Sequence, residues 1–367
     1  MEKRSEEVPE TDKLKILDAL KSIKDPDLGR DIVSLGFVKD VKLCGGAAAV
    51  TIELTTPACP VKDQMREEAK QAILALDGIE EVNVEMTARV RPSSSERQGL
   101  LSGVKNIVPV ASGKGGVGKS TVSANLAVAL AQTGAQVGLM DADVYGPSIP
   151  TMMGISEKPV SGPNQQIMPI TQYDLKIISM GFFLPQEKAV IWRGPMLDKM
   201  ITQFLGGVQW GVLDYLIIDL PPGTGDIQLS LCQKVPLTGA VIVSTPQDVA
   251  LNVAEKAISM FDQLNTPVLG IVENMSHYIC SNCGHRDEVF GTGGAREVSG
   301  RRQLPFLGEI PLSTKIRVYS DSGKPVVLAE PESEDAKAFI KVAENTAAQI
   351  SIRGMSQELE QDIKVSF

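Results

Sequence analysis

Residues 113–121 read Gly113-Lys114-Gly115-Gly116-Val117-Gly118-Lys119-Ser120-Thr121, a loop of the phosphate-binding form G-x-x-x-x-G-K-[ST]. The apolar run Ile107–Val110 precedes this loop, and residues 122–130 have the pattern of an amphipathic helix. Glycines let backbone N–H groups approach phosphate oxygens, and the following helix directs its positive end at the anion. We expect Lys119 to contact the β- and γ-phosphates of ATP and Ser120 to bind Mg²⁺.

Acidic residues follow two further apolar runs. Asp141 and Asp143 come after Val137–Met140, and Asp219 ends the run that includes Leu216–Ile218. A carboxylate leaving a buried strand is costly unless it meets a cation or water. An apolar strand that ends in an acid is the Walker B arrangement, which predicts that Asp219 supports Mg²⁺. Residues 220–226 then form a loop of glycines and prolines placed to sense the γ-phosphate.

After residue 104, apolar runs alternate with helical patterns, which is typical of an α/β fold. Near-continuous apolar strands predict a mostly parallel sheet covered on both faces, with ligands at the carboxyl ends of its strands. Further strands are expected at 240–243 and 268–272. The predicted organisation is a small α+β domain at 1–90, a linker at 91–104, a P-loop NTPase domain at 105–355 and a polar C-terminal tail at 356–367.

Within the first domain, the sequence predicts the order helix, strand, strand, helix, strand. Apolar residues recur at helical spacing from Leu14 to Ile23, strands are expected at 37–43 and 48–54, a helix at 61–76 and a strand at 82–86. Cys59 precedes Pro60 at the expected helix start, a setting that favours a thiolate. The alternative is a small buried cysteine beside a turn.

Composition excludes several classes of function. The chain has 367 residues and a formal net charge of −9, without a basic stripe, so nucleic acid binding is not expected. No apolar stretch reaches the roughly 18 residues of a membrane span. The polar, acidic N-terminus has no feature of a targeting segment, which predicts a cytoplasmic protein. Of the five cysteines, Cys44 and Cys232 are expected to be buried packing residues.

The remaining two cysteines, Cys280 and Cys283, form a Cys-x-x-Cys pair. Tetrahedral iron or zinc takes four ligands, and the chain has no second such pair. A two-fold homodimer would supply the missing thiolates. A zinc site that adds His285, with His277 as fourth ligand, and a redox-active pair are the alternatives.

Several of these motifs resemble those of a known class of ATPases. GKGGVGKST at 113–121 resembles the deviant Walker A loop of the MinD/ParA/nitrogenase iron protein class, in which Lys114 would reach the nucleotide of a second subunit. The stretches DADVYGPS at 141–148 and IIDLPPGTGD at 217–226 resemble the Mrp/ApbC branch, the iron–sulfur carrier ATPases. The resemblance implies that Asp143 positions the attacking water, that Asp141 supports the metal shell, and that Asn274 contacts adenine. Turn chemistry would also explain Asn274.

The same resemblance implies a [4Fe–4S] cluster held between subunits by Cys280 and Cys283. Residues 10–90 resemble the MIP18 family of iron–sulfur assembly domains through Asp25-Pro26-Asp27, Asp31–Gly36 and Thr55–Pro60. That second resemblance makes Cys59 a candidate cluster-transfer thiol.

The predicted function is therefore that of an ATP-binding and ATP-hydrolysing scaffold or carrier. It would hold an iron–sulfur cluster at a homodimer interface. Its expected partners are apo iron–sulfur proteins, to which it delivers the cluster, and cluster-assembly factors. No glutamine or histidine base is evident near the nucleotide, so hydrolysis is expected to be slow and dependent on the dimer. The alternative is a MinD/ParA-like spatial-organisation ATPase with a structural zinc site.

Overall fold

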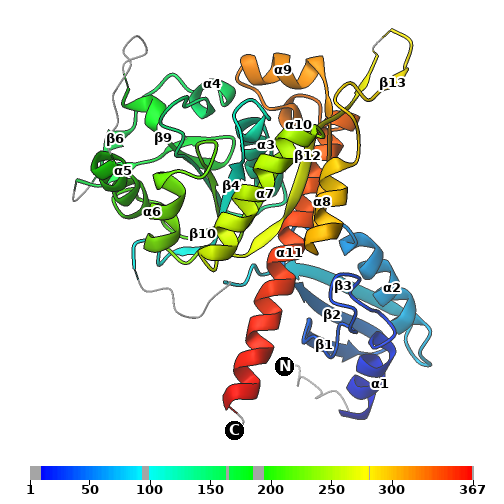
Figure 1. Cartoon of the computed structure of the whole chain (residues 1–367). Coiled ribbons are helices and arrows are strands. Elements are labelled where there is room, and N and C mark those ends of the chain that lie inside the picture. Colours follow the sequence, from blue (N-terminus) through cyan, green and yellow to red (C-terminus); the bar gives the residue numbers. More distant parts are fainter. Residues whose placement is uncertain (1–9, 93–98, 163–164, 185–193, 281, 366–367) are drawn as a thin grey trace. The chain divides into compact units, whose positions relative to one another are not determined.

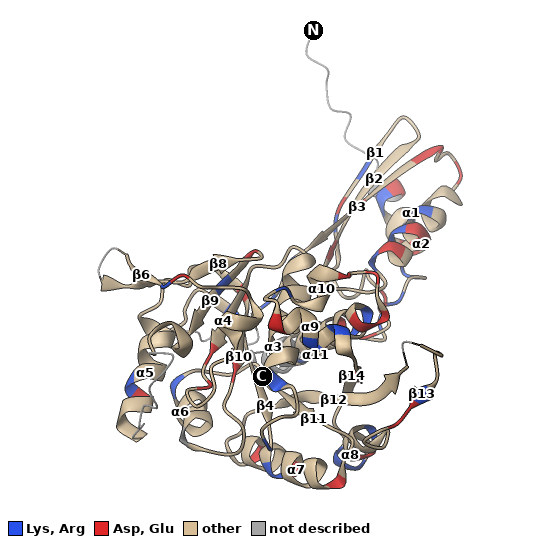
Figure 2. Cartoon of the chain, turned by 90° about the horizontal axis from the view of Figure 1, so that it is seen from above, with Lys and Arg blue, Asp and Glu red and all other residues tan. Residues whose placement is uncertain are grey.

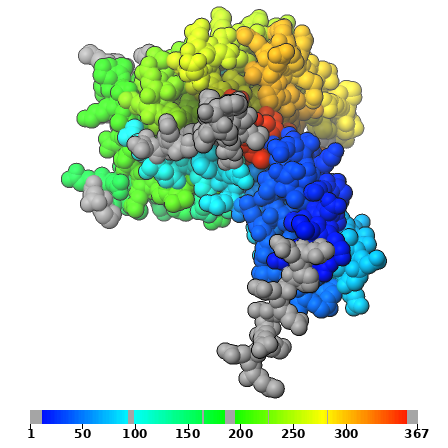
Figure 3. Space-filling model, turned by 90° about the horizontal axis from the view of Figure 1, so that it is seen from below, coloured from blue at the N-terminus to red at the C-terminus, as the bar shows by residue number. Residues whose placement is uncertain are grey.

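The computed structural model describes residues 10–92, 99–162, 165–184, 194–280 and 282–365 (Figure 1). The chain divides into two compact units, Met1–Arg91 and Pro92–Phe367. Figure 3 shows their surfaces, with the first unit coloured from blue to cyan.

The first unit is an α+β domain with a three-stranded sheet. Strands β1 and β2 are antiparallel and joined at Gly45-Gly46, where both residues have positive φ, while β2 and β3 are parallel and connected through α2. The side chains of Met65, Ala69 and Ile73 recur every four residues along α2 and are buried. The elements are α1 Glu10–Leu20, β1 Val38–Cys44, β2 Ala47–Leu54, α2 Lys62–Leu74 and β3 Glu81–Ala88.

One expectation for this unit is wrong. Cys44 was expected to pack in the interior, but its side chain is exposed. It is the last residue of β1, directly before the glycine turn.

The second unit is built on a nine-stranded mixed sheet, and it confirms the predicted α/β class. Its order is β13-β12-β11-β4-β10-β5-β9-β8, with β14 pairing on β12. All neighbouring pairs from β14 to β9 are parallel, and β13 and β8 pair antiparallel. The strands are β4 Val104–Ser112, β5 Val137–Asp141, β8 Ile170–Gln172, β9 Leu175–Ser179, β10 Leu213–Asp219, β11 Ala240–Ser244, β12 Val268–Ile279, β13 Arg286–Asp287 and β14 Phe306–Leu312.

Helices cover both faces of this sheet. In Figure 1, α6, α7 and α8 lie in front of it and α3 and α11 behind it. A separate two-stranded ribbon pairs β6 Val160–Ser161 with β7 Ile167–Met168. The helices are α3 Lys119–Gln132, α4 Ile149–Met152, the 3₁₀ helix η2 Met180–Phe182, α5 Gly194–Gly206, α6 Asp226–Lys234, α7 Asp248–Gln263, α8 Gly294–Arg302, α9 Thr314–Asp321, α10 Val326–Ala329 and α11 Glu334–Val365.

The chain reverses its direction across the sheet at β4. From β4 the connection through α3 passes over β10 to β5, whereas β10 leads back through α6 to β11 on the other side of β4. In open parallel sheets, ligands bind at such a switch point. The loop at 113–121 follows β4 and therefore lies there.

Two features of this unit were not predicted. Helix α11 continues to Val365, so the polar segment from 356 is helical through that residue. Strands β9 and β14 were not predicted, and Gly308 and Pro311 interrupt the apolar pattern of β14. Within the described residues, no helix combines the length and apolarity needed to span a membrane.

Basic and acidic residues are interspersed along α7 and α8 (Figure 2). Arg301 and Arg302 of α8 both pair with Glu255 of α7, and Nε of Arg302 lies 3.3 Å from Oε2 of Glu255. These ion pairs join α7 to α8.

Candidate functional site

The loop at 113–121 is packed so closely that two of its glycines admit no side chain. A Cβ on Gly113 would lie 2.3 Å from the carbonyl carbon of Val253 in α7. Gly118 has φ +80°, and a Cβ there would lie 2.1 Å from Nδ2 of Asn274. The loop is therefore fixed between α7 and β12, and its last three residues, Lys119–Thr121, form the first turn of α3.

Lys119 and Ser120 both contact Asp219 at the end of β10. Nζ of Lys119 donates to Oδ1 of Asp219 at 2.7 Å, and Oγ of Ser120 donates to Oδ2 at 2.6 Å. Ser123, one turn further along α3, also donates to Oδ1 at 2.7 Å. The side chains of Lys119 and Asp219 are 6% and 0% exposed, so this is a buried ion pair.

Asp141 lies directly beside Asp219, because the two residues are register partners of β5 and β10. Oδ2 of Asp141 accepts a hydrogen bond from Oγ of Ser179 in β9 at 2.8 Å. Burial, and then the negative charge of Asp219, raise the pKa of Asp141 to about 8. Asp141 is consequently protonated at neutral pH in the absence of a cation, whereas Asp219 is paired with Lys119.

Asp143 completes this group of acids. Its Oδ2 lies 3.9 Å from Nζ of Lys119, and its Oδ1 accepts hydrogen bonds from the backbone N–H groups of Tyr145 and Gly146. Burial raises the pKa of Asp143, and the Lys119 charge opposes that shift. The structure thus brings Lys119, Ser120 and the three predicted acids together.

The two neighbouring acids are expected to respond oppositely to mutation. Asp219→Asn should lower the free energy of unfolding by about 3–5 kcal/mol, because it leaves the buried Lys119 ammonium without its counter-charge. Asp141→Asn should instead raise it, because at pH 7 the folded wild type holds a proton on Asp141 that the unfolded chain has released, whereas the amide is uncharged in both states. Urea unfolding at pH 7 in EDTA, without nucleotide, measures both values.

The difference in free energy of unfolding between Asp141→Asn and the wild type should also depend on pH. Between its ordinary pKa of 3.8 and about 8, the folded protein holds a proton on Asp141 that the unfolded chain has released. Raising the pH through this window therefore destabilises the wild type. Asp141→Asn should become more stable relative to the wild type from pH 4 to pH 8. A constant difference would contradict the raised pKa.

Lys114, the second lysine of the loop, is held by a glutamine of its own chain. Its Nζ donates to Oε1 of Gln247 at 3.3 Å, and Oγ1 of Thr245 donates to the same atom at 3.2 Å. Gln247 precedes α7. Lys114 therefore lies away from the Lys119–Asp219 pair.

Asn274 lies against the phosphate-binding loop from the side of β12. It is 6% exposed, and its Nδ2 donates to the carbonyl oxygen of Val117 at 2.8 Å. The preceding residue, Glu273, is fully buried and accepts hydrogen bonds from the N–H groups of Gly293 and Ala295 at the start of α8. β12 is thus joined both to the loop and to α8.

The cysteine pair forms a tight turn between β12 and β13. The N–H of Cys280 donates to the carbonyl of His285, and the N–H of Gly284 donates to the carbonyl of Cys280. Hydrogen bonds from the backbone of Cys283, then of Asn282, lower the pKa of the Cys280 thiol. Cys283 is exposed and Cys280 is half-buried. The turn therefore presents two thiols at the surface, one of them favoured as a thiolate.

Among the described residues, neither His277 nor His285 gathers with these thiols into a metal-ligand group. Nδ1 of His277 forms a hydrogen bond with Oγ of Ser276 at 2.9 Å. In the part of the chain that the structure describes, which omits Ser281, no three or more His, Cys, Asp and Glu side chains gather as metal ligands. One chain thus offers two sulfur ligands from Cys280 and Cys283.

Two further thiols, those of Cys59 and Cys232, belong to other elements of the chain. Cys59 is half-buried, three residues before α2 begins at Lys62. Cys232 of α6 is also half-buried, and burial raises the pKa of its thiol.

Five polar residues around the site were missed by the sequence analysis. Ser123 follows Lys119 by one helical turn, so helical periodicity would have shown it. The others reach the site through the tertiary structure, and they are Ser179, Gln228, Gln247 and Glu273.

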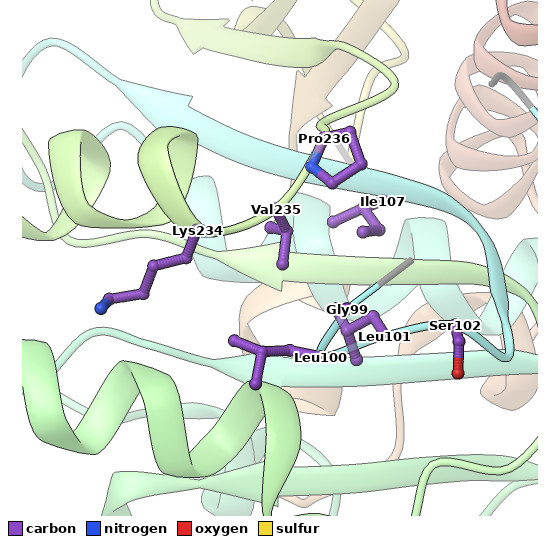
Figure 4. A pocket seen from close by; sticks show the side chains of 8 residues that line it. All are labelled: Gly99, Leu100, Leu101, Ser102, Ile107, Lys234, Val235 and Pro236. Atoms are coloured by element: carbon purple, nitrogen blue, oxygen red, sulfur yellow. The ribbon is translucent and has the colours of Figure 1, made fainter. Parts of the chain in front are cut away.

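A small pocket lies elsewhere in this unit (Figure 4). Its volume is about 20 Å³, enough for roughly one water molecule. The charged residue in its lining, Lys234, pairs with Asp198 at 3.0 Å. The pocket contains none of the predicted site residues, and its lining consists of Gly99, Leu100, Leu101, Ser102, Ile107, Lys234, Val235 and Pro236.

A parallel sheet with the phosphate-binding loop at its switch point, and an acid at the end of the neighbouring strand, defines a P-loop NTPase. The chain belongs to the family of NUBPL iron-transfer P-loop NTPases, whose model matches residues 103–347. Residues 13–86 match a second family, described as iron–sulfur cluster assembly protein. The family match confirms the class of ATPase that the motifs resemble.

Relatives share nearly the whole length of the chain. It is 49% identical over 347 residues to the iron–sulfur cluster carrier protein of Deinococcus radiodurans, covering 94% of this chain and 98% of the relative. It is 40% identical over 348 residues to the protein of the same name from Escherichia coli, covering 94% of each.

Solved structures resemble the second unit. A nucleotide-binding protein from Archaeoglobus fulgidus, solved in complex with ADP, is 43% identical, with a TM-score of 0.57 over 65% of this chain and 94% of that one. The cell division ATPase MinD of Pyrococcus furiosus is 26% identical, with a TM-score of 0.50 over 65% of this chain and 97% of that one.

Proposed function

We propose that this protein is an iron–sulfur cluster carrier that binds and hydrolyses ATP. It would hold the cluster as cargo between two copies of the chain and deliver it to apo-proteins in the cytoplasm. The family membership and the names of its relatives support the carrier role. The proposal depends above all on the position of β12. This strand contacts the phosphate-binding loop at Asn274 and ends one residue before Cys280, so it connects the nucleotide site to the cysteine turn.

The residues around the loop suit a magnesium nucleotide. Mg²⁺ prefers oxygen ligands, and Oγ of Ser120 and Oδ2 of Asp219 already lie 2.6 Å apart. We assign these two residues, with Asp141 in the surrounding shell, to Mg²⁺. The ion would supply positive charge against the phosphates when bound. Lys119 would leave Asp219 and donate to the β- and γ-phosphate oxygens.

We assign the catalytic roles in hydrolysis to Asp143 and Lys114. Asp143 would orient a water whose oxygen bonds to the γ-phosphorus as the bond to the β–γ bridging oxygen breaks, giving ADP and phosphate. Lys114 would leave Gln247 and act on the nucleotide of a second copy, which makes hydrolysis slow in the single chain. Asn274 would offer its Oδ1 to the adenine amino group while Nδ2 keeps the carbonyl of Val117.

The cysteine turn suits a thiolate-bound cluster. A [4Fe–4S] cluster takes four thiolates, and each chain supplies Cys280 and Cys283. N–H groups directed at the Cys280 sulfur stabilise its negative charge. A two-fold axis brings the same surface of each copy together. Cys59 of the first unit, within the region that matches iron–sulfur assembly proteins, is the proposed transfer thiol.

The test measures whether nucleotide binding at one site changes cluster transfer at the other. With a cluster reconstituted anaerobically, ATP and Mg²⁺ should change the rate of transfer to an apo-acceptor by about fivefold or more, the lower end of typical coupling between sites. Asp219→Asn should lose most of this change because Mg²⁺ is held less well. The time course of acceptor activation, with and without nucleotide, measures the rate.

Asp321→Asn is the matched control, since this exposed acid on α9 pairs with Arg317. It should behave as the wild type. Cys59→Ala should keep ATP hydrolysis and slow the transfer. Equal transfer rates under all nucleotide conditions would show that the two sites are uncoupled.

A further inference from the structure

A buried glutamine of α6 holds the loop at 220–226, which follows Asp219. Gln228 of α6 is 1% exposed, and its Nε2 donates to the carbonyl of Pro221 at 2.8 Å and to that of Gly223 at 3.0 Å. One side-chain amide thus bridges two carbonyls of the loop.

The other end of the same amide has no partner. Oε1 of Gln228 is buried and accepts no hydrogen bond from any described residue. The two carbonyls facing Nε2 fix which end of the amide is nitrogen, so the unpartnered atom is the oxygen. A buried acceptor without a donor is costly and uncommon in native proteins. Such an atom indicates an arrangement of the chain in which a donor reaches it.

Donors for this oxygen are present in the loop itself. A Cβ built on Gly225 would lie 3.7 Å from Oε1, so the loop backbone passes directly beside that atom. Gly223 has φ +92°, a conformation that glycine adopts and leaves at little cost. A turn of the backbone between these glycines would aim an N–H group at Oε1.

The loop also contacts the phosphate-binding loop. The N–H of Gly223 donates to the carbonyl of Ser112 at 2.9 Å, and a Cβ on Gly115 would lie 3.8 Å from Cγ of Pro222. A γ-phosphate bound by the residues after Ser112 would therefore lie beside this loop. The loop that Gln228 holds is therefore the one beside such a phosphate.

We propose that Gln228 is a positioning residue that makes this loop respond to the γ-phosphate. Its Nε2 holds the loop in both arrangements, and its Oε1 accepts a loop N–H only in the ATP-bound arrangement. Gln228 contacts neither substrate nor metal and acts through the loop. The inference rests on the proposed ATPase activity and is independent of the cluster.

The test compares two substitutions of similar length. Gln228→Met removes both donor and acceptor, whereas Gln228→Glu keeps an acceptor. We expect Gln228→Met to bind ADP with Mg²⁺ with an affinity within about twofold of the wild type. Its preference for a non-hydrolysable ATP analogue over ADP, expressed as the ratio of the two affinities, should fall about tenfold, which corresponds to the loss of one hydrogen bond. Its kcat should fall by a similar factor. Gln228→Glu should keep the preference.

Gln132→Met is the control, because this glutamine of α3 donates only to the carbonyl of Val327, at 3.4 Å. It should match the wild type. If Gln228→Met keeps the wild-type preference, or Gln228→Glu loses as much, the inference is overturned. A merely structural glutamine would lower the Tm and weaken both nucleotides equally, which also overturns it.

Hydrogen exchange in the wild type provides a readout that needs no variant. The amides of Thr224 and Gly225 should gain protection with the ATP analogue and not with ADP. Equal protection with both nucleotides would refute the two-state loop even if Gln228→Met fails to fold. A wild-type protein that binds neither nucleotide would instead refute the proposed function.

Discussion

Lys119→Ala is expected to weaken ATP binding by roughly 100-fold, because it removes a charge-assisted hydrogen bond to the phosphates. It also leaves Asp219, fully buried in the site, without its cation and facing the incoming phosphates. Both effects act against the nucleotide. Titration of a fluorescent ATP analogue against the folded variant, with its Tm recorded, gives the affinity.

Lys114→Ala is the matched comparison, since it removes the same side chain from the same loop. Lys114 donates to Gln247 and does not contact Asp219, so this variant should keep ATP affinity within a few-fold while turnover is lost. Wild-type turnover in Lys114→Ala would refute its proposed action on the second copy. Unchanged affinity in Lys119→Ala would refute the phosphate site itself.

Cys280→Ala and Cys283→Ala are each expected to abolish cluster binding. Either change leaves a two-fold site with two thiolates in place of four, and iron then meets solvent. In the wild type, iron should approach about two per chain, as for a four-iron cluster shared by two chains. Iron and acid-labile sulfide are measured after anaerobic reconstitution, together with the visible spectrum.

Cys44→Ala and Cys232→Ala are the controls for this loss, because both lie outside the turn. They should retain the cluster and its spectrum. Stoichiometric zinc without acid-labile sulfide in the anaerobically purified wild type would refute the carrier proposal. Full iron content in Cys283→Ala would place the cluster elsewhere.

The fold class was accessible from the sequence because the decisive residues are contiguous. The loop at 113–121, the run ending at Asp219 and the buried parallel strands each carry their pattern within about ten residues. Strand β14 was missed because Gly308 and Pro311 break its apolar run, and only pairing with β12 makes it a strand. Cys44 was placed wrongly because alternation along β1 does not show where the sheet ends.

The candidate site could be predicted from the sequence only in part, because only some of its residues lie on local motifs. Lys119, Ser120 and Asp219 lie on motifs whose geometry local sequence determines. Ser179 reaches Asp141 through the pairing of β9 with β5, and Gln228 reaches its loop from a helix. Such contacts follow from the tertiary structure, which no short pattern contains.

The left-handed residue Met275, at φ +57°, marks a change of environment within one strand. Before it, β12 is buried and paired with β11 through Glu273; beyond it, exposure grows until Ile279, which pairs only with the two-residue strand β13 in the described residues. Local opening costs less free energy where few apolar contacts and exposed backbone bonds hold the chain. We therefore expect the cysteine turn to open while the nucleotide end of the same strand stays closed. Cargo exchange would then proceed at the rate of a local fluctuation, and the ATPase fold would stay intact at every delivery.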